Sequence, residues 1–162
     1  MKTITILFVA MLAIAGSAFA QVDTSATTAA QGTYPAGSTF NGVAITALQI
    51  ATGALISAVG TAEGHLEISL IGPSILGAPP QTIAIDADIS GGSHAAANVA
   101  TITGTCSIDM GTGTPALTGV PFVATITTND QHLGSVGLVL GATSLPTATI
   151  NDGSMTIQDL TP

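Results

Sequence analysis

Short apolar runs with a two-residue period recur along most of the chain. In residues 81–89, two sets of side chains face opposite sides of the pattern: Ile83, Ile85, Ala87 and Ile89 on one side, and Thr82, Ala84, Asp86 and Asp88 on the other. This period is typical of a β-strand with one buried face. Residues 99–109 and 120–128 are similar and rich in Ile, Val and Thr, which favour strands. The pattern therefore predicts a β-rich fold.

The runs are separated by Gly, Pro, Asn and Asp at intervals of about ten residues. Asn129-Asp130 and Asn151-Asp152-Gly153 have the composition of hairpin turns. No long segment has helical periodicity. We therefore expect one all-β domain over residues 39–162, an antiparallel sandwich or barrel of about seven to nine short strands.

The first 38 residues lack this pattern. Residues 1–20 contain Lys2, an apolar stretch and then Ala18-Phe19-Ala20, which together are typical of a cleaved signal peptide. Residues 21–38 are small and polar, so we predict a flexible N-terminal arm outside the domain, a candidate for strand exchange between copies. A secreted protein, extracellular or periplasmic and not inserted in the membrane after cleavage, is expected.

The charge balance excludes several functions. The chain has one Lys or Arg, which is Lys2, against nine Asp plus Glu, giving a formal charge of −8. Nucleic-acid binding needs cations for the phosphates, and so does docking on anionic lipids. Nucleic acids and anionic membrane surfaces are therefore excluded as partners. Arg clamps and catalytic lysines are excluded for the same reason.

Two groups of side chains are candidate metal ligands. Asp86 and Asp88 share one strand face, where two carboxylates repel each other unless they are solvated or bridged by Ca²⁺. Glu63, His65 and Glu67 also alternate along one predicted strand and could hold a transition metal. The alternative for both groups is a solvated strand face. Apart from Ca²⁺, no cofactor is expected.

The remaining reactive residues do not predict an enzyme. Ser93-His94 follows two glycines, but the sequence has no G-x-S-x-G elbow, so a polar loop is the simpler interpretation. Cys106 is the only cysteine, which rules out an internal disulfide. It is either a buried strand residue or the site of an intermolecular disulfide.

Three segments resemble a loose family of small secreted bacterial proteins. They are Phe40-Asn41-Gly42, Gly53-Ala54-Leu55 with Val59-Gly60, and Gly104-Thr105-Cys106-Ser107-Ile108. The resemblance covers about residues 40–110. It implies a secreted, β-rich protein and no assigned activity.

The lack of lysine has a consequence for strand edges. Soluble β proteins usually protect exposed edges with Lys, inward charges or Pro, and unprotected strands pair with other chains. We therefore expect a secreted, non-enzymatic structural protein that self-associates, as a subunit of a filament, surface layer or matrix. The alternative is a monomeric barrel or sandwich that binds an unidentified apolar small molecule. A weak Ca²⁺-dependent adhesion module is the third possibility.

Overall fold

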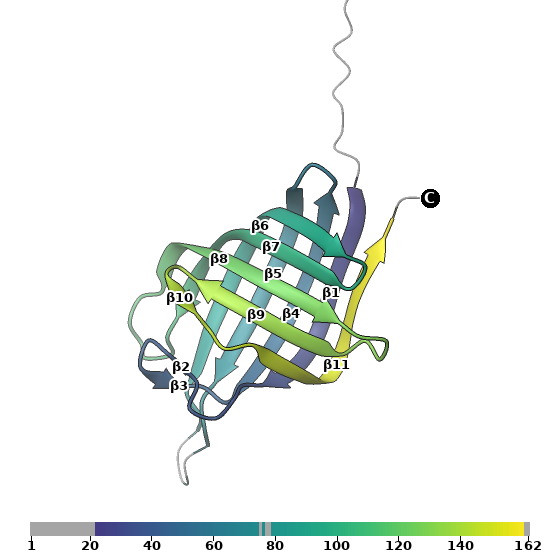
Figure 1. Cartoon of the computed structure of the whole chain (residues 1–162). Helices are drawn as coiled ribbons and strands as arrows, with labels where there is room; N and C mark the ends of the chain where they lie inside the picture. The colour runs from purple at the N-terminus through teal and green to yellow at the C-terminus, as the bar shows by residue number, and fades with distance from the viewer. Residues whose placement is uncertain (1–21, 75, 77–78, 161–162) are drawn as a thin grey trace, which may run out of the picture.

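The computed structural model describes residues 22–74, 76 and 79–160, and eleven strands account for most of them (Figure 1). The long strands are β1 (Val22–Thr33), β4 (Ala47–Ser57), β5 (Thr61–Ile71), β6 (Thr82–Ala96), β7 (Val99–Asp109), β8 (Leu117–Thr128), β9 (Gly134–Leu140) and β11 (Ala148–Asp159). The short ones are β2 (Thr39–Phe40), β3 (Val43–Ala44) and β10 (Thr143–Ser144). No helix occurs in the described ranges.

The long strands form a closed antiparallel barrel. The sheet runs in the order β10-β9-β11-β1-β4-β5-β6-β7-β8, and an additional β8–β9 pairing closes it. Eight strands make the wall, while β10 pairs with the end of β9 through two residue pairs and β2 pairs only with β3. The predicted all-β class and strand number are confirmed, and of the two architectures left open the chain adopts the barrel.

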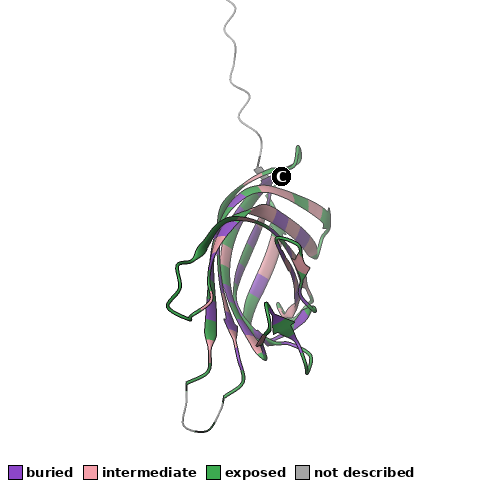
Figure 2. Ribbon diagram, turned by 90° about the vertical axis from the view of Figure 1, so that its left-hand side faces the viewer, coloured by how far each residue is buried: buried purple, intermediate pink, exposed green. Residues whose placement is uncertain are grey.

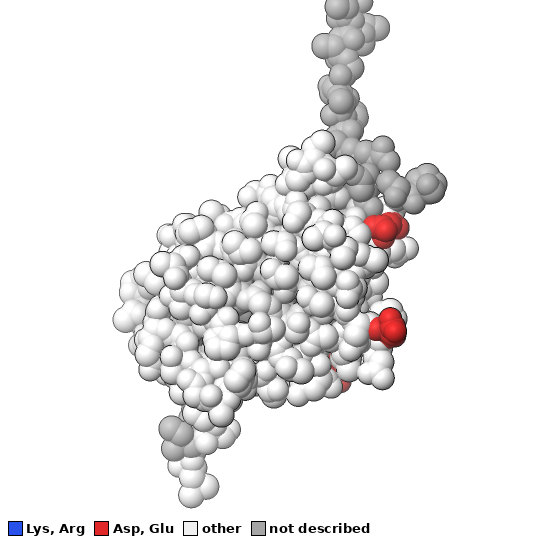
Figure 3. Space-filling model, viewed as in Figure 1, with Lys and Arg blue, Asp and Glu red and all other residues white. Residues whose placement is uncertain are grey.

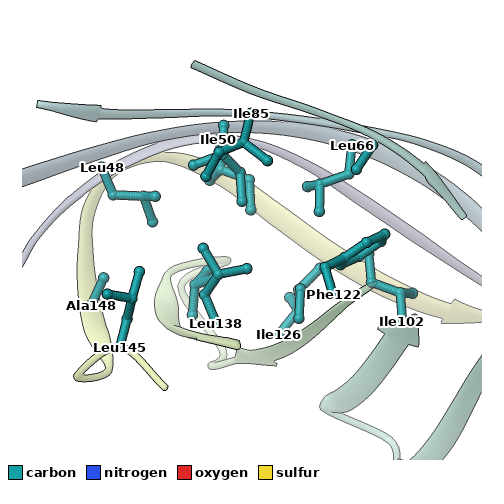
Figure 4. Close-up of a cluster of buried hydrophobic side chains, with 14 of the residues drawn as sticks. Leu48, Ile50, Leu66, Ile85, Ile102, Phe122, Ile126, Leu138, Leu145 and Ala148 are labelled. Atoms are coloured by element: carbon teal, nitrogen blue, oxygen red, sulfur yellow. The ribbon is translucent and has the colours of Figure 1, made fainter. Parts of the chain in front are cut away.

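The predicted alternation sets the inner face of the barrel. Along β6 the pattern is strictly alternating from Thr82 to Ile89, with Ile83, Ile85, Ala87 and Ile89 buried. Buried and exposed positions alternate along the other strands as well (Figure 2). Side chains from opposite walls, such as Leu48 and Leu138, point toward one another in the interior (Figure 4). Burying each such aliphatic side chain contributes about 1.5–3 kcal/mol.

One end of the barrel is capped by apolar side chains. The segment between β1 and β4 carries Tyr34, Phe40 and Ile45, and the segment before β11 carries Leu145; all four are buried in the core. The N-terminal end of β1 and the C-terminal end of β11 lie together at the opposite end (Figure 1). That opposite end also holds the β4–β5 and β6–β7 hairpin connections.

The expectation of a flexible arm over residues 21–38 is wrong. Val22–Thr33 is β1, a wall strand hydrogen-bonded to β4 on one side and β11 on the other. Its inward side chains are small, among them Ala26, Thr28 and Ala30, and each is buried. Because both faces of β1 carry small Ala, Ser and Thr side chains, the two faces differ little in composition and the alternation gives a weak sequence signal.

The hairpin predicted at Asn151-Asp152-Gly153 is also wrong. These residues lie inside β11, opposite the point where the β1–β11 register shifts between Gln31 and Gly32. A register shift with an extra residue on one strand is a β-bulge, which uses the same residue types as a turn. Asn129-Asp130, by contrast, lies in the connection between β8 and β9 as predicted.

Closure changes the argument about strand edges. Pairing β8 with β9 joins the two ends of the sheet, and closed barrels have no free edges along such ladders. In the described chain, free edges remain on the two-residue strands β2, β3 and β10 and on β11 beyond Ile150, where the β9 ladder stops and β1 continues to pair. Association through these free edges is therefore limited to short stretches.

Candidate metal centre

The two predicted groups of metal ligands meet on the outer wall of the barrel. In the antiparallel β5–β6 ladder, His65 lies directly opposite Asp88 and Glu67 lies directly opposite Asp86. Side chains of directly opposite residues on one face have Cβ atoms about 4.5–5.5 Å apart. All four side chains point outward because their neighbours, such as Leu66 and Ile85, point into the core. Two separate sequence patterns thus form one cluster.

Glu63 does not join this cluster. The β5–β6 register shifts between Thr61 and Gly64, so Glu63 is in register with Leu55 of β4 but has no partner in the β6 ladder. The bulge therefore separates the first carboxylate of the Glu63, His65, Glu67 series from the other two. Sequence spacing alone could not reveal this shift.

Three ligand atoms of the cluster lie close enough to hold one ion. His65, Glu67 and Asp86 each offer one such atom, and the three atoms lie within 4.8 Å of one another. His65 Nε2 is 3.7 Å from Glu67 Oε1 and 3.6 Å from Asp86 Oδ2. In a tetrahedral site with metal–ligand distances of about 2.0–2.2 Å, ligand atoms are separated by about 3.3–3.6 Å. Small side-chain movements would bring these three atoms to the spacing of three ligands of such a site.

The imidazole of His65 is flanked by carboxylates at both nitrogens. Asp88 Oδ1 lies 3.6 Å from Nδ1, while Glu67 and Asp86 face Nε2. A neutral imidazole carries one N–H, and ionised carboxylates only accept. If Nδ1–H points to Asp88, the Nε2 lone pair faces two acceptors. A metal ion on Nε2 would remove this conflict.

The donor set distinguishes between metals. Ca²⁺ takes six to eight oxygen ligands, whereas an imidazole nitrogen with carboxylates suits zinc and related transition metals. A carboxylate on the second nitrogen of a metal-binding histidine fixes its tautomer and orientation, which is the position of Asp88. Asp86 and Asp88, which were predicted to bind Ca²⁺ together, thus lie on different sides of the His65 ring. Asp86 lies beside Nε2 and Asp88 beside Nδ1.

The cluster lies beside a groove on the same wall. The groove has a volume of about 570 Å³, and its lining includes Glu67, Asp86, Asp109 and Asp152. The opposite side of the barrel differs: β8 and β9 contain no charged residue, and carboxylates show only near one edge of that view (Figure 3). Negative charge is therefore concentrated on one wall, where the described chain has no Lys or Arg to neutralise it.

Ser93 and His94 do not form a nucleophile–base pair. His94 Nδ1 lies 3.2 Å from Thr24 Oγ1 and 3.3 Å from Asp159 Oδ1, and Thr24 Oγ1 donates a hydrogen bond to the same carboxylate oxygen. Nε2 of His94 is buried and has no hydrogen-bond partner among the described residues. The histidine thus links β6 to β1 and β11. Ser93 and His94 both lie within β6, so the interpretation of these residues as a polar loop is wrong.

Cys106 and two hydroxyl groups lie inside the barrel. The Cys106 thiol is free and 4% exposed, and burial raises its pKa. An intermolecular disulfide would need this side chain at the surface. Thr28 Oγ1 and the Tyr34 hydroxyl are buried without a hydrogen-bond partner among the described residues. Sequence analysis did not single out these two hydroxyl groups.

No protein-family model, curated protein or solved structure matches this chain. The resemblance over about residues 40–110 therefore stays a prediction. Among the described residues, no helix has the length and hydropathy needed to cross a membrane.

Proposed function

We propose that the protein is a secreted, non-enzymatic module that binds a divalent transition metal of the zinc type on the outer wall of its barrel. The observation that carries this proposal is the grouping of His65, Glu67 and Asp86, whose ligand atoms lie within 4.8 Å of one another. The leader-like residues 1–20 support secretion.

Three features of the wall support metal binding. The ligands project from two adjacent strands of a closed barrel, and sites on regular elements are held more precisely than sites on loops. The Asp88 carboxylate is placed to orient the imidazole. The neighbouring carboxylates repel one another, so the binding of a dication relieves that repulsion.

Calorimetric titration of the protein with Zn²⁺, and separately with Ca²⁺, tests the proposal. We expect one Zn²⁺ per chain, bound more tightly than Ca²⁺, and a loss of at least about tenfold in Zn²⁺ affinity for His65→Ala. Glu63→Gln is the matched control, because it removes a carboxylate from the same strand outside the cluster. Unchanged Zn²⁺ binding by His65→Ala would contradict the proposal, and Ca²⁺ binding that ignores His65 would favour an all-oxygen site.

A second candidate function is the binding of an apolar molecule inside the barrel. Eight-stranded barrels are wide enough either to be filled by side chains or to hold one small ligand. The specific observation is the pair of unpartnered hydroxyl groups, Thr28 and Tyr34, on the inner side of an apolar interior. An apolar ligand with one polar group would give such a hydroxyl its missing hydrogen bond.

The Thr28→Val variant distinguishes a barrel that holds such a ligand from one that holds none. If a ligand is bound, mass spectrometry of an organic extract detects one apolar molecule per chain, and Thr28→Val reduces its amount. If the hydroxyl is unpaired, removing it avoids a desolvation penalty of about 1–3 kcal/mol, so the variant is more stable toward urea. A ligand-free protein stabilised by Thr28→Val would eliminate this candidate.

A further inference from the structure

A second pocket lies at the end of the barrel opposite the apolar cap. It has a volume of about 410 Å³, and its wall is built from the ends of β1, β4 and β11, the β4–β5 connection and the last part of β6. The lining residues include Thr24, Ile56, His94 and Asp159, none of which belongs to the metal cluster. Small molecules commonly bind at the mouths of β-barrels, so the donors and acceptors of this lining decide which molecule fits.

The contacts of one ring nitrogen assign the proton of neutral His94. Its Nδ1 lies 3.2 Å from Thr24 Oγ1 and 3.3 Å from Asp159 Oδ1, and Thr24 donates its single hydroxyl proton to that carboxylate oxygen. A carboxylate only accepts hydrogen bonds, so the nitrogen facing it carries the proton. The other nitrogen, Nε2, is then an acceptor, and it is buried without a partner among the described residues.

Apart from the hydroxyl groups, which both donate and accept, the free polar groups of the lining are acceptors. Asp159 Oδ2 has no hydrogen-bond partner among the described residues. Two backbone donors are already used, since Gly60 N–H donates to the Ser57 carbonyl and Gly92 N–H donates to the Gly60 carbonyl. The described chain has no Lys or Arg that could supply further donors. A ligand must therefore bring donors for Asp159 Oδ2 and His94 Nε2.

We propose that this pocket binds a small primary alkylammonium ion. An ammonium group has three N–H donors and no acceptor, so it donates to Asp159 Oδ2 and His94 Nε2 at once. Because the imidazole forms part of the pocket wall, a small rotation of the ring brings Nε2 to such a donor. The alkyl chain lies against Ile56 and Ala58. This binding function goes beyond metal binding and does not depend on it.

Other small head groups match these acceptors less well. A hydroxyl group donates one hydrogen bond, so an alcohol leaves either Asp159 Oδ2 or His94 Nε2 unpaired. A carboxylate donates none, and the charge of Asp159 repels it. The formal charge of the chain, −8, also favours a cation over a neutral or anionic ligand. The pocket should therefore select an amine over an alcohol or an acid of similar size.

NMR titration of the protein with n-butylammonium, n-butanol and n-butyrate tests the proposal, because the three probes have similar alkyl chains and different head groups. The titration is made at pH 8, where an ordinary histidine is neutral. His94 is one of three histidines, so its ring nitrogens can be followed individually. We expect butylammonium to shift the Nε2 signal of His94 and to bind at least about tenfold more tightly than butanol, because its hydrogen bonds are charge-assisted. Butyrate should show no saturable binding.

Charge-matched variants locate the binding site. Asp159→Asn keeps an oxygen acceptor for the Thr24 hydroxyl but removes the charge, so it should bind butylammonium at least about tenfold more weakly. The Asp159 side chain is 60% exposed, so this substitution leaves the core unchanged. Asp130→Asn removes an exposed carboxylate from the β8–β9 connection, and Glu67→Gln removes one from the metal cluster. Both lie outside this pocket and should bind butylammonium like the wild type.

Each contrary outcome has a distinct meaning. Equal affinities for butylammonium and butanol would overturn the selection of an ammonium group. Equal losses in Asp159→Asn and Asp130→Asn would show that net charge alone attracts the amine, and a lack of saturable binding would overturn the site. Zn²⁺ titration of Asp159→Asn separates the two proposed functions, since this variant should bind Zn²⁺ like the wild type. A protein that binds Zn²⁺ but not butylammonium would overturn this proposal alone, and the reverse result would overturn only the metal site.

Discussion

At the scale of single residues, Tyr34 is a buried ionisable group whose ionisation can be measured directly. Tyr34 is the only tyrosine, and the chain has no tryptophan, so its ionisation can be followed directly by ultraviolet absorbance. Burial raises the pKa of Tyr34 from 10.0 to about 12, and its hydroxyl lacks a hydrogen-bond partner among the described residues. The folded state therefore resists forming the tyrosinate, whereas the unfolded state does not.

This difference predicts an alkaline loss of stability. The contribution of Tyr34 is fully present below pH 10, the ordinary pKa, and is lost as the pH rises through about 12, the pKa in the folded state. Two pKa units correspond to about 2.7 kcal/mol. Urea denaturation across this pH range should show the decline, and Tyr34→Phe should remove most of its slope. An equal decline in Tyr34→Phe would assign the effect elsewhere, for example to Cys106.

At the scale of elements, sequence patterns predicted the strands wherever the two faces differ strongly in polarity. The β6 strand has Ile83 and Ile85 against Asp86 and Asp88, and its faces lie as expected. The β1 strand was not predicted because its inward residues are small and differ little in polarity from its outward residues. The candidate metal ligands were predicted strand by strand, but the pairing of His65 with Asp88 was not.

This pairing could not be predicted because the sequence of neither strand determines the register between them. It depends on the connection between two strands and on bulges along their ladder. The β5–β6 connection is long, and the bulge near Gly64 shifts the first part of β5 relative to β6. His65 and Glu67 can therefore be placed beside Asp88 and Asp86 only once the ladder is known.

The bulge in β11 makes a testable contribution to the seam between the first and last strands. Gly153 has a φ of 98°, and a Cβ there would collide with the Ala29 carbonyl oxygen of β1. Gly153→Ala therefore adds overpacking, about 1–3 kcal/mol, to the strain of a left-handed backbone, about 1–2 kcal/mol. Gly113 has a φ of 77° with nothing within 4 Å of such a Cβ, so Gly113→Ala carries the strain alone.

Urea denaturation of the two variants measures this difference. We expect Gly153→Ala to lose clearly more free energy of unfolding than Gly113→Ala. Equal losses in both variants would mean that β1 and β11 separate easily at the bulge, in conflict with a continuous ladder on both sides of it.

At the scale of the whole molecule, the apolar residues and the carboxylates of the barrel lie in different places. The interior is apolar and supplies the stability, while the carboxylates are placed outside and unevenly, with β5 and β6 carrying Glu63, Glu67, Asp86 and Asp88. The β8–β9 wall has none. Because no Lys or Arg of the described chain pairs with these carboxylates, the surface charge opposes the association of copies at neutral pH.

Acid should remove this repulsion without any metal. The sequence pI is about 4.1, so the net charge falls toward zero as the pH approaches 4 and the carboxylates take up protons. We expect light scattering to rise between pH 7 and pH 4 in the presence of EDTA. His65→Ala should behave like the wild type, because this association needs loss of charge rather than an intact metal cluster. Scattering that stays flat over this range would show that charge repulsion does not hold the copies apart.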